Sequence, residues 1–328
     1  MVDRFIIATV NGILVVEYDR GIWNGIGSHL PGNHVTSVVS TRDAVVAGTT
    51  RGIWRSGDRG STWQAADGQS TNRHIRWLSW PAGQADRVLA GTEPAGILVS
   101  PDSARSWRSA PEVEILRDRL AWFLPYSANA GCVRGFAVSG SSPEPHRIYA
   151  AVEVGGVLCS DDGGRSWQLV AGSDGDPNMD RDLGRMVHPD VHSIAVRPSS
   201  HGWVMAATGG GIYRSTDGGR TWKNIYPCYI RALWIDPLNP QRLVAGPARG
   251  VAKNGRIEVS SDGGQTWQPA MQGLPTPWAN HMVDRFARIE DFLFAVLSNG
   301  ELWYTSTRIT TWKRALPDVP GITAVTAG

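Results

Sequence analysis

The sequence predicts an all-β fold, a seven-bladed β-propeller, on three observations. An eight-residue segment that ends in tryptophan recurs along most of the chain. Short runs of small and β-branched residues recur between its copies, as expected for strands. The two ends of the chain each hold an incomplete part of one further unit. Successive closing tryptophans are 40, 44, 60, 55, 45 and 45 residues apart, a period typical of a propeller or solenoid, and they are Trp23, Trp63, Trp107, Trp167, Trp222, Trp267 and Trp312.

The recurring segment, here called the box, has Ser first, Asp third, Gly fifth and Trp last, with Ala104 in the place of Gly in one copy. Asp and Ser side chains accept hydrogen bonds from nearby backbone N–H groups, and Gly tolerates positive φ, so each box predicts a tight turn before a strand. The Trp ring is expected to be buried between neighbouring sheets. Weak copies end at Trp23 and Trp312. The five better copies are 56–63 (SGDRGSTW), 100–107 (SPDSARSW), 160–167 (SDDGGRSW), 215–222 (STDGGRTW) and 260–267 (SSDGGQTW).

These copies resemble the Asp-box, or bacterial neuraminidase, repeat S-x-D-x-G-x-T-W, and they span nearly the whole chain. The resemblance implies a propeller in which each box is a peripheral, structural turn. It is shared with sialidases, xyloglucanases, sortilin-type receptors and a photosystem II assembly-factor family. The chain resembles small single-propeller proteins described as sialidase-like or as glycosyl hydrolases. The sialidase segment F-R-I-P is not matched at residues 4–7 (RFII), so no sialidase catalytic residue is transferred.

Each repeat is predicted to hold four strands from the pore to the rim, as 34–40, 44–50, 52–58 and a strand from Thr62 do in the second blade. The chain begins at a second strand, 4–10, and ends in a run that fits an innermost strand, 321–327. The C-terminus therefore supplies the inner strand of the first blade, which leaves no free radial edge. We expect one domain over 1–328.

The bulk composition limits the function classes. A net charge of +2 is too balanced to predict nucleic-acid binding, and no run of about 18 apolar residues predicts a membrane span. The start lacks a signal-peptide core, and the three cysteines show no metal-binding spacing. These features predict reduced thiols and a cytoplasmic protein.

Three long connections, 111–131, 173–189 and 247–255, are expected on the face opposite the boxes. Loops this long in a compact fold are usually functional or disordered. No amphipathic helix is evident, apart from a turn within 118–123. The face of the long connections is therefore the predicted functional face.

Aligning the innermost strands places one residue of each at the same height around the pore. Arg76, Arg134 and Arg231 suit bidentate binding of carboxylate or phosphate. The other interpretation is that each arginine pairs with a neighbouring acid and fills the pore. The aligned set is Thr36, Arg76, Arg134, His192, Arg231, Val283 and Thr323.

Glu93 and Glu153 end two second strands near these arginines. Two close carboxylates suit general acid/base work, with His192 as a helper. Alternatively, Arg76 pairs with Glu93 and Arg134 with Glu153. Because residues two apart on a strand face the same way, His188, Asp190 and His192 are candidates for a divalent metal with an acid such as Glu153. The competing interpretation is that Asp190 only orients His192.

Trp122 and Tyr229 lie in or beside the long connections, where they either stack on a sugar or cover the core. Together these residues predict a pocket for a small anionic ligand such as an acidic sugar, with hydrolase or lyase chemistry if the protein is an enzyme. No cofactor is required by any motif. The alternative function is a non-enzymatic scaffold that binds a protein or peptide on the same face.

Overall fold

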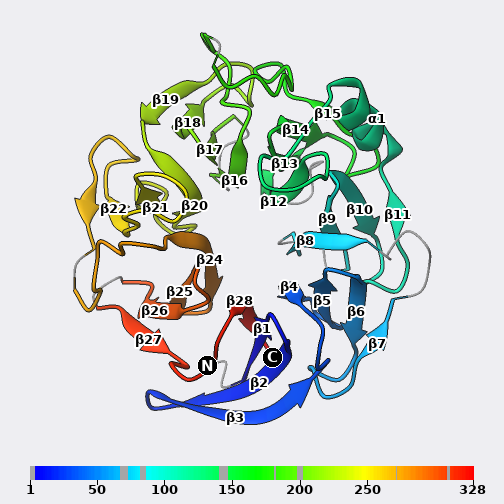
Figure 1. The fold of residues 1–328 in the computed structure, drawn as a ribbon, viewed down its shortest axis with the longest axis vertical. Coiled ribbons are helices and arrows are strands. Elements are labelled where there is room, and N and C mark those ends of the chain that lie inside the picture. The colour runs from blue at the N-terminus through cyan, green and yellow to red at the C-terminus, as the bar shows by residue number, and fades with distance from the viewer. Residues whose placement is uncertain are drawn as a thin grey trace.

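Seven four-stranded antiparallel sheets are arranged radially, like blades, around a common axis (Figure 1). The computed structural model describes residues 4–66, 73–81, 86–139, 147–180, 182–197, 202–270, 272–308 and 311–328. The predicted all-β, seven-bladed propeller is therefore confirmed.

The strands occupy four radial positions. The innermost strands are β28 (Ile322–Ala327), β4 (Val35–Ser40), β8 (His74–Ser79), β12 (Cys132–Ser139), β16 (Val191–Val196), β20 (Tyr229–Ile235) and β24 (Val283–Ile289). The second strands are β1 (Arg4–Thr9), β5 (Val45–Thr49), β9 (Val88–Glu93), β13 (Arg147–Glu153), β17 (Val204–Thr208), β21 (Leu243–Ala248) and β25 (Phe292–Leu297).

The third strands are mostly buried, and the outermost strands, apart from that of the first blade, are short and partly exposed. The third strands are β2 (Gly12–Asp19), β6 (Gly52–Ser56), β10 (Gly96–Ser100), β14 (Gly156–Ser160), β18 (Gly211–Ser215), β22 (Glu258–Ser260) and β26 (Leu302–Ser306). The outermost are β3 (Ile22–His29), β7 (Gln64–Ala65), β11 (Arg108–Ser109), β15 (Gln168–Leu169), β19 (Lys223–Tyr226), β23 (Gln268–Pro269) and β27 (Lys313–Ala315).

The C-terminus closes the ring as the sequence predicts. Strand β28 is the innermost strand of the sheet β28-β1-β2-β3 and pairs antiparallel with β1, with Val325 opposite Ile7. Thr323 Oγ1 also donates to the Val35 carbonyl of the next blade at 2.5 Å. The first blade therefore joins both ends of the chain and leaves no unpaired inner edge.

The boxes form the turns that lead from a third strand to an outermost one. In the box of 215–222, Ser215 Oγ accepts the buried N–H of Gly219 at 2.8 Å. Asp217 accepts the N–H groups of Arg220 and Thr221 and the Thr221 hydroxyl. The same bonds recur around Asp58, Asp102, Asp162 and Asp262. The tight turn predicted for each box is confirmed by this geometry.

Hydrophobic clusters fill the spaces between adjacent blades, and several box tryptophans belong to them. Adjacent blades approach so closely near the axis that three second strands hold glycine there, namely Gly48, Gly91 and Gly246. A Cβ added to Gly91 would lie 2.2 Å from the Val133 carbonyl oxygen of the next blade. The inner part of the propeller is therefore close-packed and holds its side chains in fixed positions.

One helix was not expected from the sequence. The connection that begins at residue 111 folds into α1 (Pro111–Arg119), whose Val113 is fully buried in a core cluster. Pro at the first position, acids in the first turn and arginines in the last turn are ordinary signals for a helix. They outweigh the weak apolar periodicity of this segment. No helix in the described part of the chain is long and apolar enough to cross a membrane.

Candidate functional site

The side chains of the site come from positions where the pairing register between an innermost strand and its second strand shifts. In each innermost strand, the pairing with the second strand shifts just after a buried, β-branched residue, so the next residue is unpaired. Such bulges redirect a side chain away from the sheet, often toward a functional site. The residues that follow the break are Thr36, Arg76, Arg134, His192, Arg231, Asp284 and Thr323.

This set corrects the sequence alignment at one place. In β24 the register breaks between Val283 and Arg285, so Asp284, and not Val283, is the bulge residue. Val283 is fully buried in the core between blades. In every innermost strand a β-branched residue precedes the bulge residue. Val283 is that β-branched residue in β24, so this pattern in the sequence identifies Asp284 as the bulge residue.

Three bulge side chains form hydrogen bonds to the next blade. In each case the acceptor is the backbone carbonyl of the buried residue that precedes the bulge of that blade. Thr323 bonds to Val35, Thr36 bonds to Ile75, and His192 Nδ1 lies 2.8 Å from the Ile230 oxygen. The bulges thus give the ring hydrogen bonds between blades, and they fix the His192 ring in one orientation.

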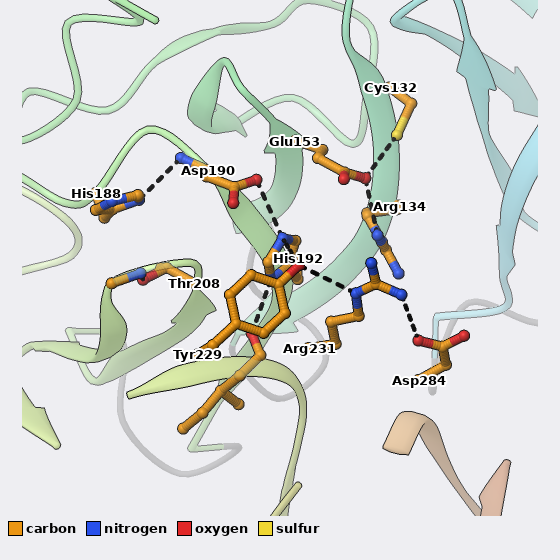
Figure 2. A network of polar contacts seen from close by, with 12 residues as sticks. Cys132, Arg134, Glu153, His188, Asp190, His192, Thr208, Tyr229, Arg231 and Asp284 are labelled. Carbon is orange, nitrogen blue, oxygen red and sulfur yellow. Dashed lines mark hydrogen bonds and ion pairs between the residues drawn. The ribbon is translucent and has the colours of Figure 1, made fainter. Parts of the chain in front are cut away.

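Arg134 and Glu153 form a buried ion pair within one blade, with Arg134 NH1 2.8 Å from Glu153 Oε2 (Figure 2). Burial favours the neutral acid, but the charge of Arg134 outweighs it and holds the pKa of Glu153 well below its usual range. Cys132 Sγ also donates to Oε2 at 3.2 Å. Burial raises the pKa of the Cys132 thiol, so it is not an activated nucleophile.

Glu93 is paired as well. Its Oε2 lies 3.4 Å from Arg76 NH1 and 3.7 Å from His74 Nδ1. Its Oε1 accepts hydrogen bonds from Ser127 and Asn129 of the long connection after α1. The Arg–Glu pairs that the sequence left as one of two interpretations are therefore both present.

A second polar chain runs from His192 to Asp284. Tyr229 Oη lies 3.5 Å from His192 Nε2 and accepts from Arg231 Nε at 3.2 Å. Arg231 NH1 donates to Asp284 Oδ1 at 2.8 Å. Figure 2 shows these groups in sequence, with Arg231 pointing toward Arg134. The structure therefore brings residues of four blades into one network.

A cavity of about 370 Å³ lies beside this network. Its lining includes Arg76, Arg134 and Asp284 from the bulges and Arg285 from β24. Arg285 stacks on the ring of Trp77 at 4.1 Å and donates to Ser37 Oγ and the Thr36 carbonyl. Sequence alignment missed Arg285, because it follows the bulge and does not occupy it.

The remaining predicted residues divide between the site and the core. Asp190 Oδ1 lies 3.0 Å from His192 Nε2, as the orienting role requires. His188 lies apart, since its Nδ1 accepts the backbone N–H of Asp190 and its ring packs near Tyr213. Trp122 is 3% exposed and donates to the Gly175 carbonyl, so it covers the core and is not available to a ligand.

Comparison with known proteins agrees with the repeats. Residues 213–224 and 258–269 match the BNR/Asp-box repeat family. The chain is a seven-bladed Asp-box β-propeller. The GH74 xyloglucanase from Xanthomonas campestris has a similar fold, with a TM-score of 0.68 at 19% identity over all of this chain and 52% of that chain.

Two further proteins similar to this Asp-box propeller differ in length. The oligoxyloglucan-reducing end-specific xyloglucanase of Emericella nidulans is 25% identical, over 59% of this chain and 26% of that protein. The propeller thus spans about a quarter of that curated relative. YCF48, solved bound to D1 peptide, is similar over 94% of this chain and 91% of its own, with a TM-score of 0.62 and 15% identity.

Proposed function

We propose that this Asp-box propeller binds a small anionic carbohydrate, such as a uronic acid, in the cavity at its axis. The cavity of about 370 Å³ falls within the usual size of small-molecule sites, ~300–1,000 Å³. Relatives named as xyloglucanases support the carbohydrate class. The anionic character rests on the arginines of the cavity wall.

Arg285 is the observation that carries the proposal. Arg76, Arg134 and Arg231 each have a carboxylate partner, whereas no carboxylate in the described residues lies within ion-pair distance of Arg285. Burial, with Arg134 and Arg76 nearby, lowers the pKa of Arg285 to about 9, so the group is still a cation at neutral pH. A half-buried cation with no ion-pair partner among the described residues is incompletely compensated, and a ligand carboxylate in the cavity would supply the counterion.

Binding is better supported than direct acid catalysis by the two glutamates. The low pKa of Glu153 keeps it ionised at neutral pH, so it is not a proton donor there. Glu93 Oε1 accepts hydrogen bonds from Ser127 and Asn129, and Oε2 lies within ion-pair distance of Arg76 and His74. In this proposal the cavity arginines bind the ligand carboxylate, and Glu93 and Glu153 hold two of those arginines in place.

Calorimetric titration of the wild-type protein with glucuronate and galacturonate tests the proposal. Arg285→Gln is expected to weaken binding at least about tenfold, since it removes a charged hydrogen-bond donor. Arg288→Gln is the matched control, because Arg288 is an exposed arginine of the same strand. Equal binding of glucose and glucuronate, or unchanged binding in Arg285→Gln, would contradict the proposal.

Peptide binding is the second candidate, and the exposed aromatic side chains of the connection after α1 favour it. Phe123 is 43% exposed and Tyr126 is 54% exposed. Exposed aromatic rings are typical anchors of protein interfaces. A peptide bound there is expected to depend on Phe123 and Tyr126 and to be insensitive to Arg285→Gln, which separates the two candidates.

A further inference from the structure

Three groups that can bind a metal ion converge where two neighbouring blades meet. One carboxylate oxygen each of Glu153 and Asp190 and one ring nitrogen of His192 all lie within 4.8 Å of one another. Glu153 ends β13, and Asp190 and His192 stand at the start of β16. Figure 2 shows both carboxylates above the His192 ring in that view. The contacts already described pair Glu153 with Arg134 and Asp190 with His192, and they assign no ligand to this group.

The hydrogen bond at Nδ1 fixes how His192 presents its other nitrogen. The Ile230 carbonyl can only accept, so Nδ1, 2.8 Å away, carries a proton. In the neutral ring Nε2 then offers a lone pair, and it faces Asp190 Oδ1 at 3.0 Å. A lone pair and a carboxylate oxygen repel at this distance unless a proton or a cation lies between them. Histidine ligands of metals commonly have this arrangement, with the remote N–H on a backbone carbonyl.

The negative charge of Asp190 is also poorly compensated by its neighbours. Glu93, Glu153 and Asp284 each have an arginine partner. For Asp190, His192 is the one ion-pair partner found in the described residues. The Asp190 side chain is 14% exposed and His192 is fully buried, so bulk water screens this negative charge poorly.

We propose that Glu153, Asp190 and His192 bind one divalent transition-metal ion, of the class of Mn²⁺ or Zn²⁺. A mixed set of imidazole and carboxylate donors suits these ions better than Ca²⁺ or Mg²⁺. Ligand atoms ~2.0–2.2 Å from a metal are at most ~4.4 Å apart. The three ligand atoms, which lie within 4.8 Å of one another, therefore need to move only slightly closer together to bind one ion. Because Arg134 and Cys132 contact Oε2 of Glu153, Oε1 is the oxygen assigned to the metal.

Three protein ligands leave coordination positions for water or for a bound molecule. Arg134 contacts Glu153 and also lines the central cavity, so the metal would lie one side chain away from that cavity. The metal proposal does not depend on the identity of the anion in the cavity. The three metal ligands are not among the residues that bind the anion.

The test is titration of the full-length, EDTA-treated protein with MnCl₂ and ZnCl₂, followed by calorimetry and by the electron paramagnetic resonance of Mn²⁺. One saturable ion per chain is expected, with a rise in melting temperature upon loading. Asp190→Asn and Glu153→Gln are each expected to weaken binding by at least about tenfold. His34→Gln is the control, since His34 also lines the cavity but lies outside the group.

Circular dichroism identifies any variant that fails to fold, and Asp190→Asn, which leaves the Arg134–Glu153 pair intact, then remains as the test. Absence of saturable binding in the wild type would overturn the proposal, because His192 would then be satisfied by a proton alone. Unchanged affinity in both carboxylate variants, or an equal loss in His34→Gln, would place the ion elsewhere and would also overturn it.

Discussion

Arg134 and Glu153 lie side by side on the two inner strands of one blade, both almost inaccessible to solvent, and share a hydrogen bond of 2.8 Å. Arg134 reaches this place because a bulge turns it out of the sheet, and Glu153 because it is the last residue of β13. The pair connects the central cavity to the proposed metal ligands.

Replacing Arg134 by Met is expected to lower the free energy of unfolding by about 3–5 kcal/mol, because Glu153 is left buried without its partner. The double variant Arg134→Met with Glu153→Met is expected to recover part of this loss, since no buried charge remains. Urea unfolding followed by tryptophan fluorescence measures both. A double variant no more stable than the single one would show that the pair is not the source of the loss.

The box of 215–222 offers a test of its structural role. Ser215→Ala removes the acceptor of the buried Gly219 N–H, so a loss of about 1–3 kcal/mol is expected. Thr216→Ala, at the exposed neighbouring position, is the control and is expected to be nearly neutral. Equal melting temperatures for wild type and Ser215→Ala would refute the structural role of the box.

The same box predicts a pH dependence. Burial raises the pKa of Asp217, but the Thr221 and Ser215 hydroxyls and the turn N–H groups outweigh it and lower the pKa from 3.8 to about 2. A lowered pKa in the folded protein means that the stabilisation is present above about 3.8 and is lost as the pH falls toward 2. The melting temperature of the wild type is therefore expected to fall more steeply than that of Asp217→Asn between pH 4 and pH 2. Parallel curves would contradict this assignment.

Ring closure by β28 can be tested by deleting residues 321–328. The deletion exposes the inner edge of β1, so the protein is expected to melt earlier and to aggregate, as judged by light scattering. Val325→Asp tests the same contact without truncation, because Val325 is buried in a core cluster. A monomeric deletion variant with wild-type melting would show that closure does not depend on this strand.

The sequence by itself determined the repeat, and the repeat determined the fold. Ser215, Asp217 and Gly219 act within eight residues of one another, so their hydrogen bonds are local and follow from their spacing. The strand missing before Arg4 and the spare strand at 321–327 likewise predicted the closure of the ring. Four of the five axial residues that carry a charged or imidazole group were found for the same reason, since each follows a β-branched residue in a recurring pattern.

The tertiary structure alone decided which of these groups meet. Asp284 was displaced by one residue in the alignment, and the register of the paired strands places it at the bulge. Arg285 has no ion-pair partner among the described residues because Asp284, its neighbour on β24, pairs with Arg231 of the adjacent blade, while Glu93 and Glu153 pair with Arg76 and Arg134. Glu153 and His192 lie on neighbouring blades, and their closeness cannot be predicted from their spacing in the sequence. Local hydrogen bonds follow from sequence spacing, whereas the partners of a buried charge are set by the packing of segments far apart in the chain.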